Sequence, residues 1–147
     1  MKILLISSTG GHFNAMRKLQ PFWSKYECCW VTFKTTSTES TLDGENVYWA
    51  YGPTNRNLIN LLCNLYLAHK IIKKEKPEFV MSTGAGVAVP FIILAKLYGI
   101  KTAFIESFSR VQELSLSARL TLPFTDSLYV QWEELASKYP KAHLIRI

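Results

Sequence analysis

The chain opens with an apolar run, Ile3–Ile6, that stops at three small hydroxyl residues and the pair Gly10-Gly11 before a helical pattern begins. Short apolar runs of this kind suit strands buried on both faces, as in a parallel sheet covered by helices. Paired glycines permit backbone angles that a Cβ forbids and let a ligand approach the main chain closely. The free N–H groups of the helix that follows favour an anion, most often a phosphate. The stretch predicts a strand, a glycine turn and a helix start, either as an anion cradle or as an ordinary turn without a ligand.

The chain length and composition predict one globular domain. A chain of 147 residues with 48% hydrophobic and 13% aromatic residues can bury a core, which argues against disorder. The formal net charge of +6 fits nucleic acid, an anionic membrane surface or a phosphorylated substrate. Cys28, Cys29 and Cys63 lack metal-ligand spacing, so we expect buried, reduced thiols, as in a cytoplasmic protein.

The sequence also limits how the protein can meet a membrane. Met1-Lys2 leads into an apolar run too short for a signal peptide, and no apolar run approaches the roughly 20 residues of a membrane span. Any membrane contact is therefore expected to be peripheral.

The remaining pattern alternates strands and helices without repeats or linkers, which predicts a single α/β domain with a doubly wound, mostly parallel sheet. Residues 111–122 are ambiguous, because alternating leucines favour a strand while their place between two strand–helix units favours a short helix, which we prefer. The strands are predicted at 2–6, 28–33, 47–51, 79–82, 101–105, 127–131 and 143–147, and the helices at 11–25 with a kink at Pro21, 38–42, 57–76, 87–97 and 132–139.

The longest predicted helix, 57–76, is apolar in its first half and basic at its end. One interpretation is a core helix whose lysines are solvated. The other is a helix that also lies against a membrane, with its lysines near anionic lipid. The residues predicted to make that contact are Leu58, Leu61, Leu62, Leu65, Lys70, Lys73 and Lys74.

Three features follow predicted strands one, four and five: the turn that ends in His12, a second glycine turn at Thr83–Gly86, and Glu106. Ligands of doubly wound sheets bind at the carboxyl ends of such strands, so the three features should line one crevice. Two glycine turns side by side can cradle a diphosphate, and Arg110 could neutralise one of its phosphates. His12 and Glu106 could move a proton. Alternatively, His12 only packs at the helix start and Glu106 pairs with Arg110.

Several common site types do not fit. The first turn lacks the third glycine of a dinucleotide fingerprint, and Phe33-Lys34 stands where NAD enzymes place an acidic residue. No P-loop lysine follows the second turn, and the sequence shows no nucleophile elbow, clustered metal ligands or nucleic-acid-binding motif. We expect no cofactor, no metal and no nucleic acid.

Six ordered segments spread over nearly the whole chain carry a family resemblance. They are Ser8–His12, Trp30–Phe33, Tyr51–Asn57, Ser82–Pro90, Phe104–Ser107 and Val130–Glu133. On these segments the chain resembles the PssD/CpsF-type polysaccharide biosynthesis proteins. These are bacterial relatives of the membrane-anchoring subunit of the two-part UDP-GlcNAc transferase that acts on dolichol diphosphate-GlcNAc.

This resemblance implies that residues 1–147 form the Rossmann-like, N-terminal, acceptor-side half of a split GT-B glycosyltransferase related to MurG. A separate PssE-type partner, expected to dock near the C-terminus, would supply the UDP-sugar-binding half. Together they would transfer a hexosyl or glucuronosyl group to an undecaprenyl-diphosphate-linked saccharide, for capsule or exopolysaccharide, at the cytoplasmic face of the plasma membrane.

The resemblance also covers the candidate site. Gly10, Gly11 and His12 match the family's first glycine loop, which faces the acceptor phosphate and contains a candidate base. Gly84–Gly86 match the second loop, and Glu106 matches the acidic position after the fifth strand. The predicted catalytic residues are therefore His12 and Glu106, and the predicted diphosphate-binding residues are Thr9, Gly10, Gly11, Thr83, Gly84, Ala85, Gly86 and Arg110.

Two other functions stay open. The chain could be a non-catalytic enhancer that anchors and stabilises a partner holding all the chemistry. It could also be a free-standing nucleotide-binding enzyme, which would bind a UDP-sugar by itself.

Overall fold

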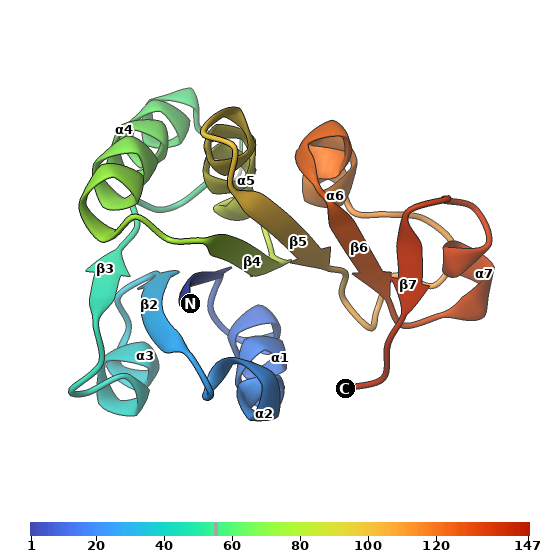
Figure 1. The fold of residues 1–147 in the computed structure, drawn as a ribbon, viewed down its shortest axis with the longest axis horizontal. Helices are drawn as coiled ribbons and strands as arrows, with labels where there is room; N and C mark the ends of the chain where they lie inside the picture. Colours follow the sequence, from blue (N-terminus) through green and yellow to red (C-terminus); the bar gives the residue numbers. More distant parts are fainter. Residues whose placement is uncertain (55) are drawn as a thin grey trace.

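The computed structural model describes residues 1–54 and 56–147 (Figure 1). Asn55, which belongs to the Tyr51–Asn57 segment of the family resemblance, lies outside the described residues. In the described part, the strands are β1 (Lys2–Ser7), β2 (Glu27–Thr32), β3 (Val47–Trp49), β4 (Phe79–Gly84), β5 (Lys101–Ile105), β6 (Ser127–Val130) and β7 (Ala142–Leu144). The helices are α1 (Gly11–Lys18), α2 (Gln20–Trp23), α3 (Thr36–Thr41), α4 (Leu58–Glu75), α5 (Ala88–Leu97), α6 (Leu116–Thr121) and α7 (Glu133–Ala136), with a 3₁₀ turn at Leu122–Phe124.

The strands form one sheet in the order β3-β2-β1-β4-β5-β6-β7. All its described pairings are parallel, so the predicted α/β class is confirmed and the sheet is wholly rather than mostly parallel. The strand order reverses between β1 and β4. The chain first adds β2 and β3 on one side of β1, and it then adds β4 to β7 on the other side. This places the carboxyl ends of β1, β4 and β5 side by side, as the sequence predicted.

Two helix layers cover the sheet (Figure 1). Ile3 and Leu5 of β1 face the layer of α1–α3, whereas Leu4 and Ile6 face the layer that contains α4, α5 and α6. This alternation is the period of two that an extended strand imposes on its side chains. Cys28 and Cys29 follow it on β2 and face opposite layers, as expected. All three cysteines are free thiols, but only Cys29 is buried, so the expectation of buried thiols is wrong for the half-buried Cys28 and Cys63.

Two predicted helices differ from the observed ones. The predicted helix 11–25 is divided at Leu19, and Pro21 lies in the first turn of α2, where its missing N–H costs no helical hydrogen bond. Within 111–122 only α6 is helical. The Ser115 side chain accepts a hydrogen bond from the Ala118 N–H and begins the helix there, so the leucine alternation does not produce a strand.

Helix α4 spans the predicted range but presents an unexpected face to solvent. Its buried side chains are Asn64, Ala68, Ile71 and Ile72. Asn64 is buried because its amide binds both the N–H and the carbonyl of Tyr51, which ties the preceding loop to the helix. The interpretation of α4 as a core helix therefore holds for its second half, where Ile71 and Ile72 are buried, but not for the four leucines predicted to contact a membrane. Those leucines are exposed: Leu58, Leu61, Leu62 and Leu65. No helix in the described ranges is long and apolar enough to cross a bilayer.

A polar cluster fixes the far end of α4 to the sheet. The Glu75 carboxylate accepts hydrogen bonds from Lys2 Nζ at 3.0 Å, from the Tyr48 hydroxyl at 3.0 Å and from the Asn46 amide. The hydrogen bond from Lys2 holds the pKa of Glu75 below its usual range, against the opposing effect of burial. One carboxylate thus joins β1, β3 and α4.

We expect Glu75→Gln to lower stability at neutral pH and to make stability less sensitive to acid. A carboxylate whose folded-state pKa is lowered stabilises the fold above its unfolded pKa of about 4.3, and that contribution is lost as the pH falls through the lowered folded-state value. Urea unfolding at pH 7 and pH 3 measures this. The difference in unfolding free energy between wild type and variant should be smaller at pH 3 than at pH 7. Glu27→Gln is the control, because Glu27 is exposed and lies 3.8 Å from the same lysine. A difference that stays constant with pH would contradict the assignment.

Candidate functional site

The three features predicted from the sequence lie together at the carboxyl edge of the sheet. A cavity of about 720 Å³ is lined by the second glycine turn, His12, Glu106 and Arg110, and a neighbouring cavity of about 650 Å³ is lined by Gly11, His12, Thr83 and Glu106. Both cavities share His12 and Glu106. The structure therefore brings the two predicted catalytic residues to the junction of two hollows.

The first glycine turn leaves the start of α1 open. Gly10 has a φ of +71°, which a residue with a side chain rarely adopts, and the helix begins at the next residue. Within the described residues, no side chain caps this helix start and no acidic residue occupies its first turn. Its N–H groups are thus available to an anion.

His12 is fixed by a pair of reciprocal hydrogen bonds to Thr83. Its Nδ1–H donates to the Thr83 carbonyl over 2.8 Å, and the Thr83 hydroxyl donates to the His12 carbonyl over 2.6 Å. When the ring is neutral, the proton on Nδ1 leaves Nε2 unprotonated, so this nitrogen can accept a proton. The Thr83 hydroxyl already donates to His12, so Thr83 fixes the position of the histidine in addition to lining the smaller cavity.

The second glycine turn is shaped around the same ring. Gly84 has a φ of +101°, and a Cβ there would lie 3.0 Å from His12 Nδ1. A Cβ on Gly86 would lie 3.1 Å from the hydroxyl of Thr54. The Ser8 N–H also donates to the Gly84 carbonyl over 2.7 Å, so the two turns are directly bonded. Glycine at position 84 is therefore required by both the backbone and the histidine.

Glu106 does not form the alternative ion pair with Arg110. No such pair occurs in the part of the chain that the structure describes, and Arg110 is an exposed residue on the wall of the larger cavity. Glu106 is only 2% exposed. Its Oε1 accepts from the Ser107 N–H at 2.9 Å and its Oε2 accepts from the Ser115 N–H at 2.7 Å. The carboxylate is thus bound to main chain on both oxygens.

The larger cavity reaches the apolar surface of two helices. Leu58 and Leu61 of α4 line it on one side, and Leu116 and Leu120 of α6 line it on the other. The α6 leucines are 63% and 51% exposed, and the sequence prediction missed them. Their spacing of four residues was the available signal, but it was obscured by the leucines between positions 114 and 122. Residues such as Thr54, Ser107 and Ser109, which also line this cavity, carried no motif that would single them out.

The basic half of α4 forms its own shallow hollow of about 630 Å³, lined by Lys70, Lys73 and Lys74 together with Tyr48 and Tyr66. Lys70 Nζ lies 5.7 Å from the centre of the Tyr66 ring, and Lys74 Nζ lies 5.8 Å from that of Tyr48. The three lysines predicted to contact a membrane are therefore neighbours on one surface, beyond the exposed leucines of the same helix.

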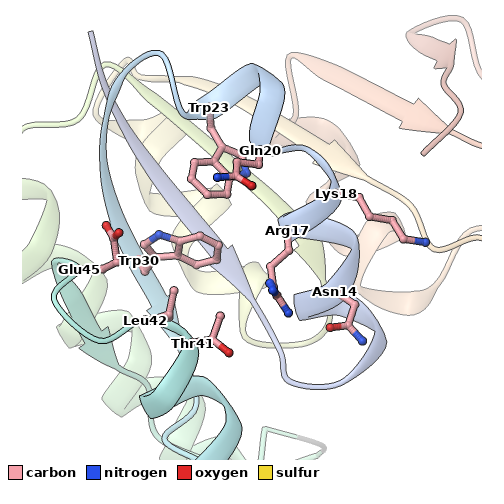
Figure 2. A pocket seen from close by; sticks show the side chains of 9 residues that line it. All are labelled: Asn14, Arg17, Lys18, Gln20, Trp23, Trp30, Thr41, Leu42 and Glu45. Atoms are coloured by element: carbon pink, nitrogen blue, oxygen red, sulfur yellow. The ribbon is translucent and has the colours of Figure 1, made fainter.

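A further cavity lies in the opposite helix layer, between α1, α2 and α3 (Figure 2). Its walls include Arg17 and Lys18 of α1, Trp30 of β2 and Glu45, and its volume is about 600 Å³. Its described lining includes none of the predicted site residues. Among the described residues there is also no group of three or more His, Cys, Asp or Glu side chains that could hold a metal ion.

We expect Gly84→Ala to displace the His12 ring, because the new Cβ would press against Nδ1. Gly44→Ala is a matched control, since Gly44 has a φ of +83° and a Cβ added there would meet nothing within 4 Å. Both variants should lose about 1–2 kcal/mol of stability through the left-handed backbone. Only Gly84→Ala should move the His12 ring resonances in an NMR spectrum, and unchanged resonances in a folded variant would contradict this packing.

Comparison with solved structures supports the fold assignment. The chain superposes on Acinetobacter baumannii MurG with a TM-score of 0.73 and 16% identity, covering 98% of this chain and 45% of MurG. S. aureus MnaA, in a structure with UDP, gives a TM-score of 0.76 and 15% identity, with 97% of this chain and 44% of MnaA covered. This α/β domain therefore matches one half of the GT-B fold of these proteins.

Comparison with sequences identifies the family. The chain is 34% identical over 141 residues to the UDP-N-acetylglucosamine transferase subunit ALG14 of Yarrowia lipolytica, covering 92% of this chain and 62% of that protein. It is 37% identical over 108 residues to the Debaryomyces hansenii subunit, covering 67% of this chain and 43% of that one. The chain thus spans less than two thirds of these relatives. The family model described as "Oligosaccharide biosynthesis protein Alg14 like" matches residues 52–147, and the chain belongs to this Alg14-like family.

Proposed function

We propose that the chain is the acceptor-binding subunit of a two-part glycosyltransferase. A separate partner subunit, of PssE type, supplies the half that binds the UDP-sugar. The acceptor is a saccharide linked to a lipid diphosphate, of the undecaprenyl type in capsule or exopolysaccharide synthesis. The observation that carries this proposal is the junction at His12, where a histidine, two open glycine turns and an apolar-rimmed cavity meet.

The glycine turns suit the diphosphate of such an acceptor. Thr9, Gly10 and Gly11 lead into α1, and the turn Thr83–Gly86 leads to α5. Helix α1 begins without a side-chain cap among the described residues, so its first N–H groups can bind phosphate oxygens. At the start of α5 the N–H groups of Ala88 and Val89 already donate to the carbonyls of Ala85 and Gly86, so phosphate binding on that side would rest on the turn and not on the helix start. Arg110, exposed on the wall of the larger cavity, adds a cation that can pair with a phosphate. The bond of Ser8 to Gly84 keeps the two turns at a fixed separation.

His12 is the proposed general base. Its Nδ1–H is held by the Thr83 carbonyl, so Nε2 takes the proton of the attacking hydroxyl. The acceptor oxygen then forms a bond to the anomeric carbon of the donor sugar, and the bond from that carbon to UDP breaks, with UDP carrying away the electron pair. The imidazolium later returns its proton to solvent. Of the two predicted catalytic residues, His12 has the nitrogen free to do this.

The exposed leucines give the lipid part of the acceptor a path. Leu58 and Leu61 of α4 and Leu116 and Leu120 of α6 all line the larger cavity and are exposed. We place this part of the cavity against the hydrocarbon of the cytoplasmic membrane face, with the outward leucines of α4 in the interface. The lysine surface of Lys70, Lys73 and Lys74 would then contact anionic headgroups.

We expect His12→Asn to lower the turnover of the reconstituted two-subunit enzyme by about 100-fold to 10,000-fold. The asparagine amide can still donate to the Thr83 carbonyl but cannot accept a proton from substrate. The measurement is kcat with a UDP-sugar and a short-chain lipid-diphosphate acceptor, with partner binding determined separately. His69→Asn is the control, because His69 lies on α4 and is hydrogen-bonded to Tyr98. Full turnover by His12→Asn with intact partner binding would favour the non-catalytic enhancer, whereas UDP-sugar binding by this chain alone would favour the free-standing enzyme.

We expect the triple change of Lys70, Lys73 and Lys74 to glutamine to weaken binding to anionic vesicles by roughly a hundredfold, because each lysine near such a surface contributes about 1 kcal/mol. Co-sedimentation with phosphatidylglycerol vesicles measures this, and the effect should fade at high salt.

A matched triple variant keeps the same charge change on other exposed surfaces: Lys25→Gln, Lys34→Gln and Lys101→Gln. It should bind nearly as well as wild type. Equal losses in the two triple variants would show that net charge alone drives binding, which would remove α4 as the contact surface.

A further inference from the structure

Glu106 has an unusual set of partners for a residue at a reaction centre. Its two carboxylate oxygens bind the N–H groups of Ser107 and Ser115, which are the two ends of one loop. A buried carboxylate is costly unless it is well hydrogen-bonded, and charge-assisted bonds to backbone N–H groups are among the stronger ones. One side chain thereby closes a loop of nine residues, 107–115, at its base.

The outer part of this loop is tied down as well. Trp132 Nε1–H donates to the Phe108 carbonyl over 2.7 Å, and Lys138 Nζ donates to the Gln112 carbonyl over 2.6 Å. Both donors come from the segment around α7. The loop is thus held along its length by the residues that flank α7 and at its base by Glu106.

The loop carries side chains into the candidate site. Ser107 and Ser109 line both cavities, and Arg110 lines the larger one. The hydroxyls of the two serines lie 3.0 Å apart and are hydrogen-bonded. The position of these three polar groups relative to His12 therefore depends on where the loop is held.

We propose that Glu106 is a positioning residue that holds the acceptor-binding loop 107–115, and that it does not transfer the proton. This inference rests on the proposed function. A general base must take up a proton, and a protonated Glu106 would no longer carry the negative charge that strengthens its hydrogen bonds to the two amides. Proton uptake would therefore weaken the contacts that close the loop. The geometry thus commits both carboxylate oxygens to the loop and leaves the proton to His12 Nε2.

The test uses the full chain with its partner subunit and two ways of breaking the same contact. Glu106→Gln keeps the shape but can accept only one of the two amide hydrogen bonds. Ser115→Pro removes the other end of the contact and leaves the carboxylate intact, and the φ of −62° at Ser115 suits proline. Ser115→Ala is the control, because it loses the helix cap that proline also loses but keeps the N–H.

We expect both Glu106→Gln and Ser115→Pro to raise the acceptor KM about tenfold, with kcat changed by less than about threefold, since one charge-assisted hydrogen bond is lost. Amide hydrogen exchange in 107–115 should speed up about tenfold in both, while β1 and β4 stay protected. The pH profile of kcat should keep the shape of the wild type. The KM of Ser115→Ala should lie well below that of Ser115→Pro, because the alanine variant keeps the N–H that Glu106 binds.

The opposite pattern would overturn the proposal. Glu106→Gln would then lower kcat a hundredfold or more and remove one limb of the pH profile, with exchange in the loop unchanged. Failure of the proposed function can be told apart from failure of the role of Glu106. If the proposed function is wrong, the wild-type protein with its partner will show no transfer to a lipid-diphosphate acceptor. Hydrogen exchange in Glu106→Gln would still test the loop contact in that case.

Discussion

The candidate site depends on the contact between two turns that lie 71 residues apart in the chain. His12 and Thr83 bind each other through two hydrogen bonds, and Ser8 binds Gly84 beside them. The contact exists because β1 and β4 are neighbours at the point where the strand order reverses. Their helices therefore leave toward opposite faces of the sheet, with α1 on one side and α5 on the other. An anion at the start of α1 would therefore lie beside the second turn, because the two turns are joined there.

The layer of α4, α5 and α6 follows a different constraint. A helix on a sheet normally turns its apolar stripe inward, and the second half of α4 does so with Ile71 and Ile72. Its first half buries Asn64 instead and exposes Leu58 and Leu62. Asn64 is turned inward because its amide satisfies the main chain of Tyr51, and this fixes the rotation of the helix. The outward leucines are thus a consequence of how the preceding loop is held. Contiguous exposed apolar side chains of this size are typical of interaction surfaces, which is why the proposed membrane contact is placed on these leucines.

The sequence was sufficient to predict the strands, the parallel sheet and the grouping of His12, Thr83 and Glu106. These follow from short-range patterns and from the rule that places sites at the carboxyl ends of strands. It was not sufficient for the partners of Glu106, because they depend on the path of a loop without a periodic pattern. The orientation of α4 was equally inaccessible, since the leucine spacing indicates a stripe but not whether that stripe faces inward. The predicted functions of the site residues stay predictions.

The site divides its tasks between the two sides of the sheet. The candidate base His12 stands on α1, in the layer opposite the apolar surface, whereas Leu58 and Leu116 stand on α4 and α6. A ligand that contacts both must pass over the edge of the sheet, across the second glycine turn. Small residues are needed there, because a Cβ on Gly84 would meet His12 and a Cβ on Gly86 would meet Thr54. The glycines of the second turn therefore leave room for the His12 ring and for the Thr54 side chain at this edge of the sheet.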